Sequence, residues 1–283
     1  MNVEQYLHTH NGVARTSDVK AATSRRQLDK SLRQGTVKRL NRNVVHLPQI
    51  NKERLAVFCH HGYLTCLSAL KHYGIATWNR PDETIHVAVH KGTHAVYMDN
   101  VLLHRESCIP QCELVVPPLQ AVIRAIQCVS THLERVVIID SALNKRLINE
   151  EELTREVIKL RRNDLIRAIE DSNRKSRSPL ETYGRLELAG LGYNFEVGVI
   201  IKPIGEVDML FENKLIVEFD GYEFHSDLNA FTHDRWRTCV AAQLGLYTIR
   251  FTHDQALKPG YLRQEVSAFF KQLECRQEMG KAD

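Results

Sequence analysis

Apolar and polar residues alternate in the stretch GEVDMLFENKLIVEFDGYEFHSD, residues 205–227. Side chains of a strand point to opposite faces with a period of two, so the alternation predicts strands over 206–211 and 215–220. Closing them as a three-residue hairpin pairs Phe211 with Leu215. The apolar face is then expected to consist of Val207, Met209, Phe211, Leu215, Val217 and Phe219.

The other face of this hairpin carries acids. The expected register sets Asp208 opposite Glu218 and Glu206 opposite Asp220. Like charges that face each other, with Cβ atoms roughly 5 Å apart, destabilise a strand pair. Solvated acids on an edge hairpin are one explanation. A bound cation is the other, which we favour because apolar residues continue the same face beyond the acids; Mg²⁺ prefers such carboxylate oxygens.

The rest of the last third predicts a mixed core of order αβββαβ, followed by a further helix. The expected elements are helix 179–191, strands 194–201, 206–211 and 215–220, helix 228–244, strand 246–252 and helix 260–274. Ser178, Pro179 and Glu181 have the spacing of a capping box at the start of the first helix. Helix capping is by itself a sufficient reason for an acid at position 181.

The N-terminal residues predict three helices and a small ribbon. Helices are expected over 2–11, from Thr16 or Ser17 to Ala22, and over 25–34 between an N-cap at Ser24 and a closing Gly35, with strands over 36–40 and 44–47. This order is typical of a winged helix, whose third helix enters the major groove of DNA.

A concentration of basic residues coincides with the third helix and the ribbon. Only Asp29 opposes them between residues 24 and 45. We expect these cations to contact DNA phosphates, and they are Arg25, Arg26, Lys30, Arg33, Lys38, Arg39 and Arg42. A solvated basic face on a small α/β module is the alternative.

The middle of the chain shows no catalytic constellation. Its pattern predicts helices at 63–73, 119–128, 133–143 and 150–169, strands at 84–89 and 101–104, and a polar linker at 171–178. The fold class is therefore α/β (α+β). We expect a winged helix over 1–50, a small α/β domain over 51–150, a helical linker over 151–177 and a second large domain, with the αβββαβ core, over 178–283.

Composition excludes several classes of protein. The net charge is only +4, and neither a signal-peptide layout nor an apolar run long enough for a membrane span is present, which favours a cytoplasmic location without a membrane partner. The seven cysteines are scattered without CxxC spacing, so neither a disulfide framework nor a zinc knuckle is indicated. The histidines lack helical metal-ligand spacing, and we do not expect a zinc site.

Ser178 to Thr252 resembles the PD-(D/E)XK nuclease fold in its very-short-patch-repair-like branch. The motifs SPLE, GEVDML, VEFDGYEFH and DRWR occur in the expected order. Residues 1–150 resemble, less specifically, the AbiEi-type antitoxin architecture, through the helix and wing pattern and the stretches LSALKHYGI and DSALNKRLI.

The nuclease resemblance implies roles for five residues. Asp208 is the central metal ligand, and Glu218 and Asp220 are the further expected ligands. Asp220 stands where many members carry a catalytic lysine. His225 is the implied general acid or base, although an exposed loop histidine without a role is the alternative. Glu181 is either the helix cap or a further acid of the metal cluster.

Three functions remain open from the sequence. The favoured one is a DNA endonuclease that uses Mg²⁺ or Mn²⁺ in defence or a toxin–antitoxin system. The second is an inactive, antitoxin-type DNA-binding regulator, which the missing lysine favours. The third is a nuclease directed at RNA, because carboxylates do not distinguish the sugar. The sequence also leaves a homodimer open.

Overall fold

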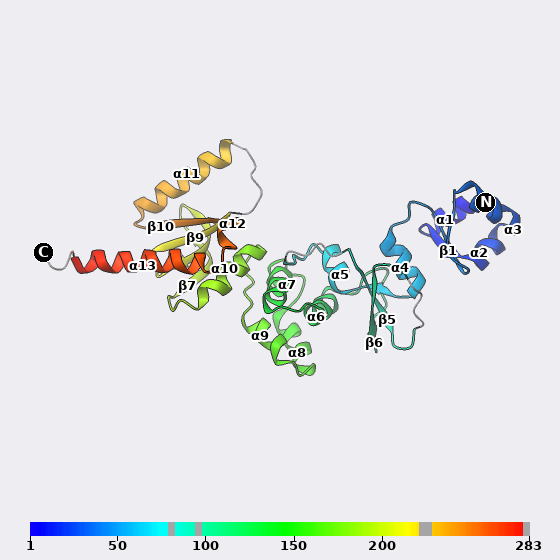
Figure 1. Ribbon diagram of the computed structural model, residues 1–283, viewed down its shortest axis with the longest axis horizontal. Coiled ribbons are helices and arrows are strands. Elements are labelled where there is room, and N and C mark those ends of the chain that lie inside the picture. Colours follow the sequence, from blue (N-terminus) through cyan, green and yellow to red (C-terminus); the bar gives the residue numbers. More distant parts are fainter. Residues whose placement is uncertain (79–82, 94–97, 221–227, 280–283) are drawn as a thin grey trace. The chain divides into compact units, whose positions relative to one another are not determined.

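A computed structural model describes residues 1–78, 83–93, 98–220 and 228–279 (Figure 1). The chain groups into two compact units, of which the first comprises 1–74 with 81–125 and the second comprises 75–80 with 126–283. Both contain helices and sheets, so the expected α/β class is confirmed. The division into four segments stays a prediction.

The first unit begins with three helices and an antiparallel sheet of order β1-β3-β2. The elements are α1 (Val3–Thr9), β1 (Val13–Arg15), α2 (Thr16–Ala22), α3 (Arg25–Gln34), β2 (Lys38–Asn41) and β3 (Val44–His46). Ser24 caps α3 by accepting the Gln27 N–H at 3.2 Å, and Gly35 ends it with a φ of 73°, as expected. Strand β1 was not predicted, and α2 begins after Arg15 without a side-chain cap.

A second small sheet, of order β4-β5-β6, follows in the first unit. The elements are α4 (Lys52–His60), β4 (Tyr63–Leu64), α5 (Cys66–His72), β5 (Ile85–His90), β6 (Val101–Glu106) and α6 (Pro118–Cys128). Helix α4, which was not predicted, contacts both sheets, because Leu55 packs near Val44 whereas Ala56 packs near Val87. The helix expected from residue 63 starts only at Cys66, because Tyr63 and Leu64 pair with β5.

The second unit starts with α7 (His132–Asn144), α8 (Glu150–Lys159) and α9 (Asn163–Glu170). A single helix over 150–169 was expected, and this prediction is wrong. The chain turns at Arg161, whose φ is +54°. The break lets the apolar faces of both halves become buried, through Leu153 on α8 and Leu165 on α9.

The C-terminal part has the predicted order of helices and strands (Figure 1). It consists of α10 (Pro179–Ala189), β7 (Phe195–Ile201), β8 (Gly205–Phe211), β9 (Leu215–Asp220), α11 (Leu228–Gln243), β10 (Tyr247–Thr252), the unpredicted α12 (His253–Ala256) and α13 (Tyr261–Met279). The sheet order is β10-β9-β8-β7, with β10 parallel to β9. Helices α10 and α13 share one core cluster with β8 and β9, while Ala241 of α11 belongs to another.

The β8–β9 register is the expected one, since Phe211 pairs with Leu215 and Met209 with Val217. Pairing ends there, because the Phe219 N–H donates to Oδ2 of Asp208 at 2.8 Å. The expected pairs of opposed acids are therefore not backbone partners. The expected place of Val207 is also wrong, since it packs with residues such as Ile216.

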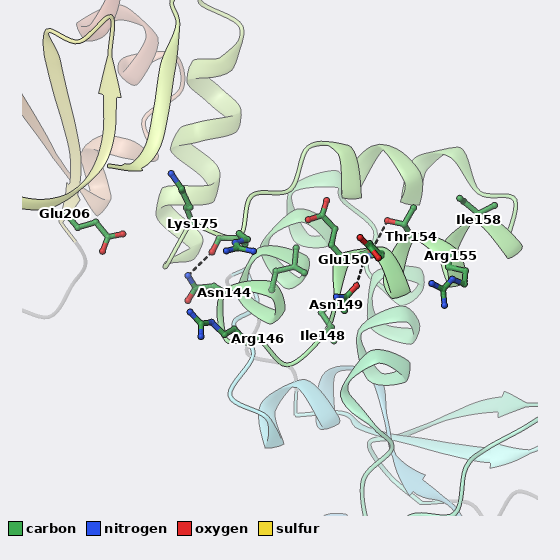
Figure 2. Close-up of a pocket in the computed structure, with 13 residues that line it drawn as sticks. Asn144, Arg146, Ile148, Asn149, Glu150, Thr154, Arg155, Ile158, Lys175 and Glu206 are labelled. Atoms are coloured by element: carbon green, nitrogen blue, oxygen red, sulfur yellow. Dashed lines mark hydrogen bonds between the residues drawn. The ribbon is translucent and has the colours of Figure 1, made fainter. Parts of the chain in front are cut away.

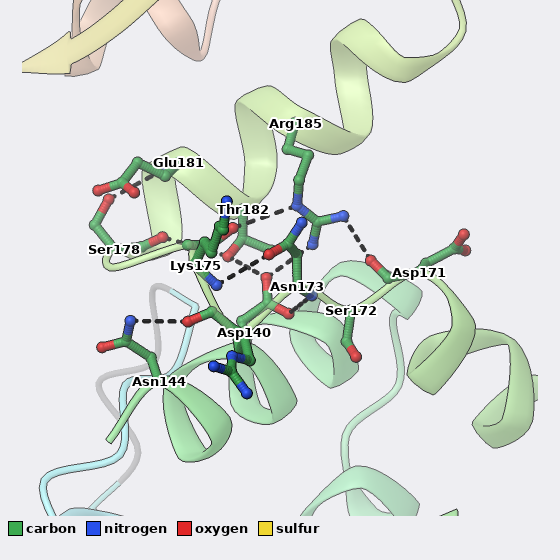
Figure 3. Close-up of polar contacts among 12 residues, drawn as sticks. Asp140, Asn144, Asp171, Ser172, Asn173, Lys175, Ser178, Glu181, Thr182 and Arg185 are labelled. Atoms are coloured by element: carbon green, nitrogen blue, oxygen red, sulfur yellow. Dashed lines mark hydrogen bonds and ion pairs between the residues drawn. The ribbon is translucent and has the colours of Figure 1, made fainter. Parts of the chain in front are cut away.

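Residues 171–178, expected as a polar linker, are anchored to α7 through a buried aspartate. Oδ1 of Asp140 accepts the Asn173 N–H at 2.6 Å, and Oδ2 accepts bonds from Thr182 Oγ1 and Arg185 Nη2, both at 2.8 Å (Figure 3). Arg185 also donates to the Asp171 carbonyl at 2.6 Å. Since Asp140 is only 1% exposed, this ion pair lies in the interior and holds the start of α10 against α7.

Removal of the Asp140 carboxylate should destabilise the second unit. Asp140→Ala leaves Arg185 buried without its counter-ion, so we expect a loss of about 3–5 kcal/mol in the free energy of unfolding, measured by urea denaturation. Glu156→Ala removes an exposed ion pair with Lys159 and should cost under about 1 kcal/mol. Equal unfolding midpoints for the two variants would contradict the role of Asp140.

Candidate functional site

Four of the five expected catalytic residues lie in the described part of the chain. Asp208 is on β8, Glu218 and Asp220 are on β9, and Glu181 is on α10. His225 lies outside the described residues. The four acids interact electrostatically, since the charge of Asp208 raises the pKa of Glu181, Glu218 and Asp220.

A glycine sets the distance between α10 and the sheet. A Cβ atom on Gly184 would lie 2.1 Å from the ring of Phe219 on β9, so the helix backbone packs directly on this ring. Glu181 is three residues earlier on the same helix and is 6% exposed. The close packing thus helps to bring a helix carboxylate near the acids of the two strands.

The Glu181 carboxylate is held by the backbone around it. Oε2 accepts the Arg177 N–H at 2.9 Å, and the Glu181 N–H donates to the Ser178 hydroxyl at 3.1 Å. Only the serine half of the expected capping box is therefore present. Burial, followed by the charge of Asp208, raises the pKa of Glu181 to about 7.

Arg177 lies between two acids of β8. Its Nη2 donates to Oδ1 of Asp208 and its Nη1 to Oε2 of Glu206, both at 3.1 Å. Both oxygens of Asp208 are therefore engaged, one by this guanidinium and the other by the Phe219 N–H. The Arg177 side chain is 45% exposed, so solvent reaches this ion pair and weakens it.

Two further arginines hold Glu218. Arg237 of α11 donates to Oε1 at 2.8 Å, and Nε of Arg250 on β10 lies 3.0 Å from Oε2. Burial raises the pKa of Glu218, whereas the two guanidinium charges lower it. Arg237 and Arg250 thus hold one carboxylate of β9 between them.

Sequence reasoning missed a histidine at this edge of the sheet. Strand β10 runs parallel to β9, and Thr252 pairs with Asp220. His253 therefore begins α12 at the edge where Asp220 ends β9. One feature of the sequence could have indicated His253, since it directly follows the predicted strand that ends at Thr252. The carboxyl ends of neighbouring parallel strands meet at one edge of a sheet, so a residue at this point lies near the end of β9.

The basic residues expected to contact DNA are accessible. All seven are exposed on α3, on β2 or in the turn that follows β2: Arg25, Arg26, Lys30, Arg33, Lys38, Arg39 and Arg42. Arg25 also lies 3.8 Å from Asp29, but its side chain is 84% exposed, so this pair contributes little.

A cleft in the second unit extends from α8 to Glu206 (Figure 2). Its volume is about 1130 Å³. The charged residues that line it include four cations, Arg146, Arg155, Arg174 and Lys175, and three acids, Glu150, Glu151 and Glu206. Because Glu206 shares Arg177 with Asp208, the cleft ends beside the acid cluster.

A group of one thiol and two imidazoles that could hold a metal ion lies elsewhere. Cys66, His86 and His104 belong to the first unit, and their ligand atoms all lie within 4.8 Å of one another. Among the described residues, this is the one cluster in which three or more potential metal ligands lie this close together. The acids around Asp208 do not form such a cluster. These donors resemble zinc ligands more than magnesium ligands.

The sequence had given no indication of this group. Its three members come from α5, β5 and β6, so no short spacing pattern joins them. Predicting the group requires knowing that β5 and β6 are parallel neighbours, with Ala88 opposite His104. Burial, together with the charges of His86 and Arg124, lowers the pKa of His104 to about 4, so this imidazole is neutral at pH 7.

Across the described part of the chain, no helix combines the length and apolar character needed to cross a bilayer. A scan against protein-family models finds no match, and a search of curated proteins finds none either.

Replacing Gly184 should show whether the close packing of α10 matters. Alanine normally stabilises a helix interior, but Gly184→Ala places a methyl group against Phe219 and should cost about 1–3 kcal/mol of unfolding free energy. Gly190→Ala is the control, because its Cβ meets only the flexible end of Arg263, at 2.9 Å. Equal stability of both variants in urea denaturation would refute the packing argument.

The Glu181 pKa predicts a pH dependence of stability in the presence of a chelator. The folded-state pKa, about 7, is above the ordinary value of 4.5, so the folded state binds more protons between these pH values. The free energy of unfolding should therefore fall as the pH rises from 4.5 to about 7. Glu181→Gln should reduce this fall, whereas Glu196→Gln, at an exposed site on β7, should not. An unchanged pH dependence in Glu181→Gln would contradict the assignment.

Proposed function

We propose that the chain is a metal-dependent endonuclease acting on DNA, with its active site at Asp208 and the acids around it. One observation carries the proposal: two largely buried carboxylates, those of Glu181 and Asp208, have little positive charge beside them. Among the described residues, Arg177 is the one side chain that forms an ion pair with either of them, through Asp208, and it pairs with Glu206 as well. Negative charge at this position exceeds the positive charge next to it. A divalent cation would remove the imbalance.

The donor chemistry of these residues suits Mg²⁺, with Mn²⁺ as a substitute, because carboxylate oxygens are the ligands that both ions prefer. Asp208 and Glu181 would hold the ion, with Asp220 as a third donor. Glu218 would have to break two ion pairs to join them, so we assign it, with Arg237 and Arg250, to positioning β9. When bound, Mg²⁺ would lower the pKa of a water molecule and stabilise charge on a phosphodiester.

The protein's own side chains supply the remaining functions. Arg177 would leave Asp208 when a cation binds, and its exposed guanidinium would then be free to bind a phosphate oxygen. The raised pKa of Glu181 suits proton transfer near neutral pH. By resemblance His225 would also transfer protons, and His253 is a second histidine at the same sheet edge.

Nucleic acid would be bound mainly through phosphates. The exposed cations of α3 and β2 would contact the duplex, and the cations of the cleft would guide a strand toward Glu206 and Asp208. Such binding is expected to weaken steeply with salt, because each neutralised phosphate releases counter-ions.

A DNA-binding regulator without catalytic activity is the second candidate. One observation favours it: arginines form ion pairs with both Asp208 and Glu218. The resemblance adds that Asp220 stands where many nucleases of this fold carry a lysine. In this case the same cluster would be a structural ion-pair network, and the basic residues of α3 would carry the function.

Cleavage assays should separate these functions. We expect the full chain to cleave supercoiled plasmid or linear duplex only with Mg²⁺ or Mn²⁺, and Asp208→Asn to lose on the order of 100-fold or more in rate. Glu196→Gln, an exposed acid on the same sheet, is the matched control and should retain full activity.

Other results of the cleavage assay would contradict the proposal or change its substrate. Cleavage that persists in Asp208→Asn, or that needs no metal, would refute the assigned site. Tight DNA binding without cleavage under either metal would favour the regulator. Cleavage of structured RNA with DNA left intact would transfer the proposal to RNA.

A further inference from the structure

We propose that a pocket in the first unit binds a nucleotide through its terminal phosphate, with Arg15 and Arg42 as the charged ligands. The nucleotide would be either a free nucleoside monophosphate or the phosphorylated end of a DNA strand. The pocket has a volume of about 560 Å³ and is lined by residues of β1, α2, β2, β3 and α4 and of the turns beside them. The inference does not rest on the proposed nuclease activity, since the pocket and the acid cluster share no residue and belong to different units.

The sheet β1-β3-β2 turns Arg15 toward α4. Side chains alternate along a strand, so Val13 and Arg15 point to the same face. Val13 packs in one cluster with Cys59 of α4, whereas Ala14, on the opposite face, packs with Leu28 of α3. The pocket therefore lies on the α4 face of this sheet, and α3 covers the other face.

Two cations line the pocket. Arg15 is the last residue of β1, and its Nη2 donates to Nε2 of His61, just after the end of α4, at 3.3 Å. Arg42 is exposed in the turn between β2 and β3. The carbonyl of Asn43 in this turn accepts the N–H of Thr16 at 2.9 Å, which fixes the backbone beside Arg42 close to that beside Arg15.

No carboxylate opposes these two charges among the described residues that line the pocket. The acid nearest to Arg15 along the chain, Asp18, accepts the hydroxyl of Ser17 at 2.8 Å. Guanidinium groups bind phosphate oxygens through paired hydrogen bonds. A phosphate monoester carries a charge of about −1.5 to −2 at pH 7, so it would balance both arginines. An internal phosphodiester carries only one charge and would balance one of them.

The rest of the pocket suits the sugar and base of a nucleotide. Its volume lies within the range of about 300–1,000 Å³ that is usual for small-molecule sites. Phe58 and Val44 supply an apolar wall, and the ring centroids of Phe58 and His61 are 6.5 Å apart. Bases stack on aromatic side chains of this kind. The amide oxygen of Asn41 accepts the Asn43 N–H at 2.8 Å, which leaves the amide nitrogen to donate to a ligand.

An internal phosphate of a duplex bound by α3 is the competing explanation. Of the seven cations expected to contact DNA, Arg42 alone lines the pocket. The other six lie on α3 and β2, and α3 is on the far face of the sheet. A pocket that shares one cation with the DNA-binding set is better explained by a ligand of its own.

Calorimetric titration of the full chain with the four deoxynucleoside 5′-monophosphates tests the proposal. A chelator is present, so that no phosphate binds through a metal ion at the acid cluster. We expect at least one of the nucleotides to bind about 10-fold or more tightly than inorganic phosphate, because the base adds stacking. The corresponding nucleoside, which lacks the phosphate, should not bind detectably.

Substitutions at the pocket should weaken this binding. Arg15→Gln should lose about 10-fold or more in affinity, and Arg15→Lys should recover part of it, because lysine keeps the charge without the paired bonds. His61→Ala should also weaken binding, while His61→Gln, which can still accept the Arg15 hydrogen bond, should restore most of it. Lys71→Gln is the control, since it removes an exposed charge of α5 outside the pocket and should bind normally.

The unmodified chain covers the case in which these variants fail to fold. Addition of nucleotide should shift the backbone amide signals of residues 41–44 and 58–61 in nuclear magnetic resonance spectra. Shifts confined to other residues would overturn the proposal. Equal affinity for inorganic phosphate and nucleotides, or unchanged affinity in Arg15→Gln, would overturn it as well.

DNA oligonucleotides with a 5′-phosphate or a 5′-hydroxyl distinguish the two sources of the nucleotide. Tighter binding of the phosphorylated strand, lost in Arg15→Gln, would identify a strand end as the ligand. Binding of free nucleotides without this preference would identify a nucleoside monophosphate. If neither free nucleotides nor the 5′-phosphate make a difference, the proposal is wrong and the arginines contact internal phosphates.

Discussion

The negative charge that β8 and β9 bring to one end of their sheet must be balanced, and this requirement shapes the second unit. Three arginines meet it from three directions: Arg177 from the segment before α10, Arg237 from α11 and Arg250 from β10. A buried carboxylate without a partner is costly, so each of these elements is tied to the sheet by charge as well as by packing.

The same requirement separates two groups of acids. Glu218 has an arginine at each oxygen and is about as fully compensated as a carboxylate can be. Asp208 shares the half-exposed guanidinium of Arg177 with Glu206, and the Glu181 carboxylate accepts only the backbone N–H of Arg177. The first arrangement maintains a structure, whereas the second leaves charge for a ligand to balance, and our proposal of nuclease activity depends on this contrast.

Local patterns in the sequence predicted much of this fold. Period-two alternation gave the hairpin with its register, and Ser24 and Gly35 marked both ends of α3, because these signals act within a few residues. The divergence of β8 from β9 was not predictable in this way, because there a side chain of Asp208 replaces a backbone partner. The turn at Arg161 interrupts a helical pattern that the residues alone would continue.

The candidate sites show the same limit. The acids could be recognised because they recur at fixed intervals on neighbouring strands. Their arginine partners come from elements far away in the chain, and the Cys/His group joins residues 38 positions apart, from Cys66 to His104. Such contacts depend on how helices pack against sheets, which the spacing of residues along the chain does not record.

The ion pair between Asp140 and Arg185 bears on how this chain could be divided. A fragment that starts at residue 178 would contain every strand of the sheet, but it would carry an interior cation whose partner had been left behind on α7. The smallest autonomous piece must therefore extend back through α7, and any recombination event that transferred the sheet to another protein would have to include that helix.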